Sequence, residues 1–104
     1  MSDWSPRDLV TLTGVKLLSR PDMETRVVPG FKVPQRFGRA EFHIEVEGEP
    51  RLIRVGSNYW DAAVEQFADI QGDTVDVTFL PMPYAMFGKS GTSYYFYEIR
   101  EGEA

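Results

Sequence analysis

Apolar and polar residues alternate along several short stretches of the chain, a pattern typical of strands with one buried face. Residues 39–47 show it most clearly, with three apolar side chains on one side and polar side chains on the other. We predict a strand there and a return strand over 51–55. A four-residue loop beginning at Glu47 keeps both apolar faces together and pairs Ile44 with Ile53.

A further strand is predicted over residues 9–18. Its alternation slips at Gly14, and a glycine at such a slip indicates a β-bulge, which bends and twists a strand. Residues 19–38 are punctuated by prolines and glycines, so we expect a long irregular loop.

Residues 58–70 have helical spacing, with Asn58 as the expected N-cap. The predicted core-facing stripe consists of Trp60, Ala63, Val64, Phe67 and Ala68. Residues 75–80 then predict a strand that ends at Pro81 and Pro83, because proline lacks the N–H of a sheet ladder. A loop over 81–92 and a last strand over 93–100 complete the pattern.

The order of these elements resembles the OB-fold, a five-stranded, partly open barrel with a helix between its third and fourth strands. The matching features are the bulge at Gly14, the helix over 58–70 and the strand GDTVDVTFLP that follows it. The expected fold class is therefore all-β with one helix, as a single domain over 1–104. A five-stranded mixed sheet with one packed helix is the competing fold.

The amino-acid composition excludes several classes of functional site. The 104 residues include no cysteine and one histidine, which excludes disulfides, a thiolate nucleophile and cysteine or His-rich metal sites. The N-terminus is polar and no apolar run reaches membrane-spanning length, so we expect a cytoplasmic protein that does not enter a membrane. No nucleophile with a base stands out, and the GKS of 88–90 lacks the first P-loop glycine. We expect neither an enzyme nor a cofactor.

Charge is unevenly distributed within a net charge of -5. Residues 20–39 carry five basic residues and two acidic ones, and residues 81–97 carry Lys89 and no acid. These two stretches match the loops that OB-folds use to bind oligonucleotides, as far as the resemblance holds. Both also contain aromatic residues, on which bases stack for about 1–3 kcal/mol each while basic side chains follow the phosphates.

The resulting hypothesis is a single-stranded nucleic-acid-binding protein with little sequence specificity. It resembles the small single-stranded-DNA-binding proteins of phages and mobile elements, so DNA is preferred to RNA as the ligand. The candidate binding residues are Arg26, Phe31, Lys32, Arg36, Phe37, Arg39, Arg54, Tyr84, Phe87, Lys89 and Tyr95. Homodimers or higher oligomers fit this hypothesis because one barrel spans few nucleotides, and a replication or host protein is a candidate partner.

Three alternatives remain open at this point. Phe31 and Phe37 would also suit a lid folded back onto the barrel. The acidic residues of 41–49 would suit an interaction module for a phage or host protein, or a nucleic-acid mimic. The aromatic last strand would suit an oligomeric structural subunit that pairs edge to edge.

Overall fold

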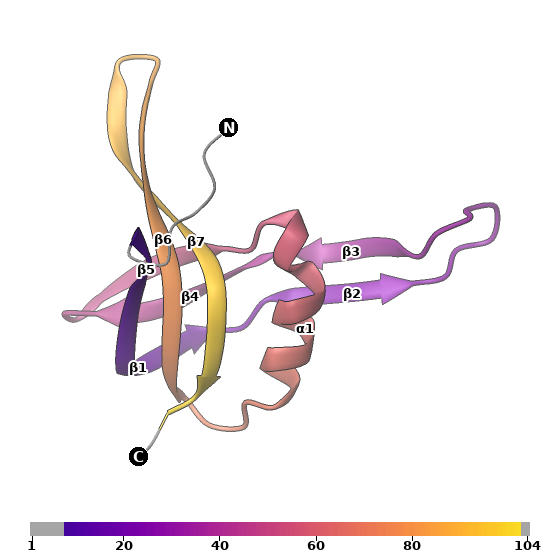
Figure 1. Ribbon diagram of the computed structural model, residues 1–104, viewed down its shortest axis with the longest axis horizontal. Helices are drawn as coiled ribbons and strands as arrows, with labels where there is room; N and C mark the ends of the chain where they lie inside the picture. Colours follow the sequence, from indigo (N-terminus) through magenta and orange to yellow (C-terminus); the bar gives the residue numbers. More distant parts are fainter. Residues whose placement is uncertain (1–7, 103–104) are drawn as a thin grey trace.

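The computed structural model describes residues 8–102 of the chain, which form seven strands and one short α-helix that lies beside the barrel strands (Figure 1). The elements are β1 (Val10–Ser19), β2 (Asp22–Arg26), β3 (Gln35–Arg39), β4 (Glu41–Val46), β5 (Glu49–Arg54), the 3-10 helix η2 (Ser57–Tyr59), α1 (Trp60–Ala68), β6 (Thr74–Met86) and β7 (Lys89–Glu101). Five strands close a barrel in the order β1-β4-β5-β7-β6, and β2 and β3 form a separate two-stranded sheet. The expected fold class, all-β with one helix, is confirmed.

The helix lies after the fifth strand of the chain, not between the third and fourth as expected. The difference arises because the expected loop over 19–38 is not irregular: most of it forms β2 and β3, paired from Asp22 with Arg39 to Arg26 with Gln35. Those two strands lie outside the barrel, so β5 and β6 are the third and fourth strands to enter it. The closed barrel is compatible with an OB-fold-like architecture. Within residues 8–102 no helix is long and apolar enough to cross a membrane.

The core is built from the alternating positions of the barrel strands. Phe42, Phe79 and Phe96 are almost completely buried, and the rings of Phe42 and Phe96 meet edge to face with centroids 6.0 Å apart. Phe67 of α1 packs its ring 4.9 Å from that of Phe42. Edge-to-face pairs of this kind add about 0.5–1.5 kcal/mol each beyond the area they bury.

The predicted helical stripe is only partly correct. Trp60 and Ala63 are buried, but Val64 is 40% exposed because α1 covers the barrel with a narrow face. Asn58 does not cap the helix: it lies inside η2, Tyr59 precedes the first α-helical residue, and neither helix start has a side-chain capping bond.

The predicted register of the β4–β5 hairpin is wrong by two residues. Phe42, not Ile44, lies opposite Ile53. The connection is a two-residue turn in which Glu47 and Gly48 both have positive φ, 54° and 80°. Such turns match the right-handed twist of paired strands, which favours the shorter loop although Glu47 must adopt a left-handed conformation.

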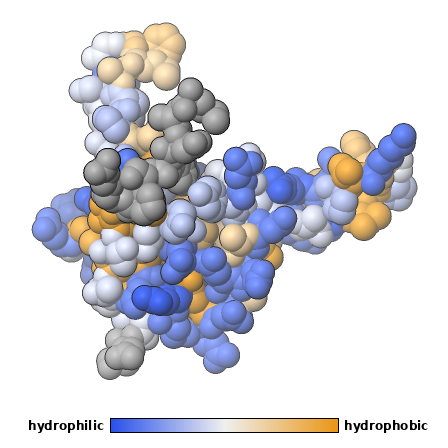
Figure 2. Space-filling view, in the orientation of Figure 1, coloured by the Kyte–Doolittle hydropathy of each residue, from blue (hydrophilic) through white to orange (hydrophobic). Residues whose placement is uncertain are grey.

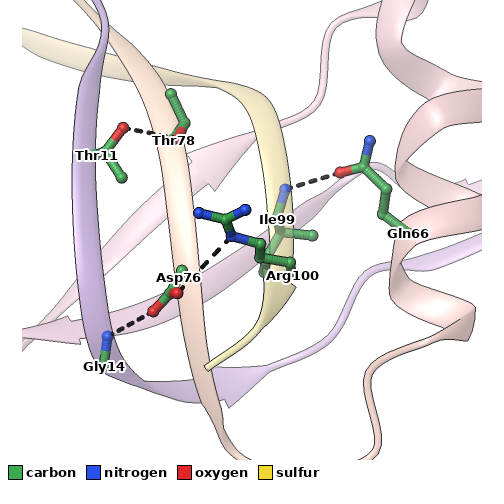
Figure 3. A network of polar contacts seen from close by, with 7 residues as sticks. All are labelled: Thr11, Gly14, Gln66, Asp76, Thr78, Ile99 and Arg100. Atoms are coloured by element: carbon green, nitrogen blue, oxygen red, sulfur yellow. Dashed lines mark hydrogen bonds and ion pairs between the residues drawn. The ribbon is translucent and has the colours of Figure 1, made fainter. Parts of the chain in front are cut away.

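The bulge in β1 is confirmed. The pairing of β1 with β6 shifts between Leu12 and Val15, and Gly14 has a φ of 64°. The freed N–H of Gly14 donates to the Asp76 carboxylate at 2.9 Å, and Arg100 lies 3.8 Å from the other oxygen of that carboxylate (Figure 3). The bulge is therefore held by a side chain of the neighbouring strand.

The predicted end of the sixth strand is also wrong. β6 continues through Pro81 and Pro83, and β7 begins at Lys89 after a turn at Phe87 and Gly88. The expected loop over 81–92 is thus a β-hairpin that projects beyond the barrel (Figure 1).

The end of β7 is joined to the segment after α1 by a carboxylate. Glu101 accepts hydrogen bonds from the backbone N–H groups of Gln71 and Gly72, at 2.8 and 2.9 Å. Arg20 donates to the carbonyl groups of Ile70 and Gly72, both at 3.0 Å. The Gln71 and Gly72 hydrogen bonds, with a smaller contribution from Arg20, lower the pKa of Glu101 below its ordinary value of 4.5.

A lowered carboxyl pKa stabilises the folded state above the unfolded-state pKa and loses that effect as the pH falls through the folded-state pKa. We therefore expect Glu101→Gln to lower the melting temperature at pH values above 4.5, with the difference shrinking at more acidic pH. Thermal unfolding followed by circular dichroism at several pH values measures it. Glu98→Gln, an exposed glutamate of the same strand, is the control. Equal melting curves of Glu101→Gln and wild type at neutral pH would contradict the expectation.

Candidate nucleic-acid interface

The β2–β3 sheet forms an arm that is attached to the start of α1. Trp60 donates its indole N–H to the Thr25 hydroxyl at 2.9 Å, and Arg36 donates to the Ser57 carbonyl at 3.0 Å. The Arg36 guanidinium also lies 5.4 Å from the centre of the Trp60 ring, within the range of a cation–π contact. The base of this arm is thereby fixed beside η2.

Two of the candidate residues on this arm bind each other. The Arg26 guanidinium lies 4.0 Å from the centre of the Phe37 ring, and its Nε lies 3.2 Å from the Glu24 carboxylate. One face of Phe37 is therefore occupied by a cation, and the charge of Arg26 is partly offset by Glu24. Both residues are less available to a nucleic acid than the sequence suggested.

The tips of both arms carry exposed apolar side chains, seen as orange patches at the two extremities of Figure 2. Phe31 is 57% exposed and Phe87 is 94% exposed. The alternative in which Phe31 and Phe37 close a lid on the barrel is therefore wrong, because the paired strands carry these rings outward. Lys32 and Lys89 are exposed near the two tips. The tips lie far apart (Figure 1), so the predicted residues do not form one cluster.

Other candidate residues meet where the barrel closes. β5 and β7 run parallel there, with Arg54 in register with Tyr95. Arg54 also lines a shallow pocket of about 290 Å³ together with Tyr84, at the base of the β6–β7 arm. In the same pocket the Arg51 guanidinium lies 4.5 Å from the centre of the Tyr94 ring. Cations and aromatic rings are thus adjacent along this surface.

A second pocket lies on the η2 side of Tyr95. It measures about 330 Å³ and its lining is Gly56, Ser57, Asn58, Tyr59, Met82 and Tyr95. Ser57 is the residue whose carbonyl group binds Arg36. Among residues 8–102, no acidic side chain lines this pocket or the Arg54 pocket. We call the surface from Arg36 through η2 and Tyr95 to Arg54 and Tyr84 the junction strip.

Arg39 lies elsewhere. It lines a pocket of about 540 Å³ that also contains Asp22 and Glu41. Glu41 lies opposite Arg54 across the β4–β5 ladder, so an acidic side chain borders the junction strip on its β4 side. In the Arg39 pocket the Ser19 hydroxyl lies 3.0 Å from His43 Nδ1, and none of the described residues forms a group of three or more metal-ligating side chains.

Sequence reasoning missed several residues of this surface. They are Arg51, Ser57, Asn58, Tyr59, Met82 and Tyr94. Arg51 lies opposite Ile44, and its contact with the Tyr94 ring could not be foreseen because the β6–β7 hairpin was expected to be a loop. The helical spacing predicts an α-helix that begins at Asn58, and no sequence signal distinguishes the 3-10 turn that forms there.

No family model matches the chain, and neither the curated proteins nor the solved structures include a match. The structure itself shows a closed five-stranded barrel, compatible with an OB-fold-like architecture, that carries two projecting hairpins.

We expect the hydrogen bond from Trp60 to Thr25 to protect the β2–β3 arm from local unfolding. Thr25→Val keeps a β-branched side chain but leaves the indole N–H without its acceptor, which costs about 1–3 kcal/mol for a buried donor. We expect the amide hydrogens of β2 and β3 to exchange several-fold faster in this variant, as measured by hydrogen exchange with mass spectrometry. Thr13→Val, an exposed threonine of β1, is the control. Unchanged protection of β2 and β3 in Thr25→Val would show that this bond does not anchor the arm.

Proposed function

We propose that this protein binds single-stranded nucleic acid, with DNA as the preferred ligand, along the junction strip. The observation that carries the proposal is that no described residue lining the Arg54 pocket or the Tyr95 pocket is acidic. The chain has 16 Asp and Glu residues against 11 Lys and Arg residues, so an acid-free surface with several aromatic rings is unusual for its composition.

The chemistry of the strip suits an unpaired strand better than a duplex. Arginine side chains at its two ends, Arg36 and Arg54, provide charges for phosphates. Tyr84 is 46% exposed in the Arg54 pocket, and Tyr95 lines the second pocket, so both present ring surface on which unpaired bases stack. A base-paired strand has its base faces covered by neighbouring bases and would gain nothing from these rings.

Arg54 gives the most direct test. The logarithm of single-strand affinity falls with the logarithm of salt concentration by about 0.7 for each phosphate contact. We expect Arg54→Ala to reduce the slope for an oligo-dT by about 0.7, as measured by fluorescence titration at several salt concentrations.

Arg100→Ala is the matched control, since it removes the same charge from an arginine that is paired with Asp76 at the other end of β7. Its salt slope should equal that of wild type. Equal slopes for Arg54→Ala and Arg100→Ala would remove Arg54 from the interface. Failure of the wild-type protein to bind any oligonucleotide at low salt would refute the proposed function.

The exposed arm tips favour a second candidate function, a protein-interaction module. Val27 is 84% exposed, Phe31 57% and Val33 64%, and on the other arm Met86 is 60% exposed beside Phe87. Contiguous exposed apolar side chains of this kind commonly mark contacts between proteins, including contacts between copies of one chain. The two candidates differ at the tips, because the first would use the tip rings to stack bases where a bound strand extends beyond the junction strip.

Phe87 separates the two candidates. Its side chain is 94% exposed, so Phe87→Ala should leave the melting temperature unchanged. If its ring stacks on a base, as we expect, the variant loses about 1–3 kcal/mol of oligonucleotide affinity regardless of base sequence. Fluorescence titration and light scattering measure affinity and oligomeric state on the same samples. Unchanged affinity with loss of self-association would instead assign the tip to protein contact.

A further inference from the structure

We propose that the pocket between η2 and the base of the β6–β7 arm holds one nucleobase and gives the protein a preference among bases. This inference rests on the proposed function and goes beyond it, because the sequence indicated binding with little base specificity. The pocket is an open depression of about 330 Å³ between the end of the barrel and the first turn of the β5–α1 connection.

The walls of the pocket suit a flat aromatic ligand. Tyr95 and Met82 come from β7 and β6, which are paired at this level, and Tyr59 of η2 faces them across the pocket. The Tyr59 ring is held by the ring of Tyr97, with centroids 5.8 Å apart. Aromatic rings and a thioether offer polarisable surface, which favours stacking of a base over binding of a sugar or a phosphate.

The polar groups of the pocket lie on one side of it. Ser57 and Asn58 are exposed, and the Asn58 amide has no hydrogen-bond partner among the described residues. An amide carries a donor and an acceptor next to each other, which lets it form two hydrogen bonds with the edge of one base. The pattern of donors and acceptors differs among bases, so Asn58 would favour some of them over others.

The surrounding charges suit a nucleotide rather than a neutral ring compound. Arg36 binds the carbonyl group of Ser57 on one side of the pocket, and Arg54 lies in register with Tyr95 on the other. A base in the pocket would therefore have a cation near the phosphate on each side of its sugar. None of the six residues that line the pocket is acidic.

The test compares homopolymers. Wild-type protein should bind oligo-dA, oligo-dC and oligo-dT of equal length with affinities that differ by at least about fivefold, and Asn58→Ala should reduce that difference while the salt slope stays unchanged. Gln71→Ala, which removes an exposed amide beyond the other end of α1, is the control and should keep the wild-type preference. Fluorescence titration measures all three proteins.

A second variant tests the cavity itself. Met82→Trp places a larger side chain in the pocket, and we expect it to weaken binding of the preferred homopolymer at least severalfold without a change in salt slope, since no phosphate contact is lost.

Two results would overturn the inference while leaving the proposed function in place. One is binding by wild type with no difference among homopolymers. The other is a preference that survives both Asn58→Ala and Met82→Trp, with Arg54→Ala still reducing the salt slope. If wild type binds no oligonucleotide at low salt, the proposed function fails and the inference fails with it.

Discussion

The barrel closes where β5 and β7 run parallel, with Arg54 in register with Tyr95. Parallel neighbours cannot be joined by a tight turn, so a longer connection must separate the two strands in the chain. Here that connection consists of η2, α1 and β6. The closure therefore places η2 beside the outward side of β7 and packs Ala63 and Phe67 of α1 against the core. The junction strip is a consequence of how this barrel closes.

The two arms depend on the barrel in different ways. A two-stranded hairpin is marginally stable alone, so each arm needs further support. The β6–β7 arm prolongs two strands that are already paired inside the barrel. The β2–β3 arm follows the paired strands β1 and β4 after a break at residues 20–21 and 40, and it is also held by side chains, with Arg26 on Phe37 along the arm and Thr25 bound by Trp60 at its base. Anchoring at the base leaves the tips free for contacts.

The alternation of apolar residues was sufficient to predict the core, the bulge at Gly14 and the fold class. It could not fix the β4–β5 register, because a shift of two residues keeps every side chain on its own face and only the turn geometry decides. Nor could it show that β6 passes through Pro81 and Pro83. The β1 ladder on that strand reaches Phe79, and beyond it no described residue pairs with that edge of β6. Two prolines spaced by two can both direct their missing N–H toward such an edge. The pockets of the junction strip depend on the β4–β5 register and on the extension of β6, so the sequence analysis did not identify Met82 and Arg51 as pocket residues.

The acidic residues outside the junction strip have a physical role in the proposed function. A net charge of -5 repels phosphates from most of the surface, so under this proposal a strand would be held only where cations and rings are adjacent and acids are absent. Glu41 opposite Arg54 sets the limit of that region on the β4 side. A uniformly basic barrel would attract duplex and single strands alike through phosphate charge. With few cations available, binding must draw much of its free energy from stacking, and stacking is open only to unpaired bases. In the proposed function, the acidity of the chain is therefore the reason for a preference for single strands.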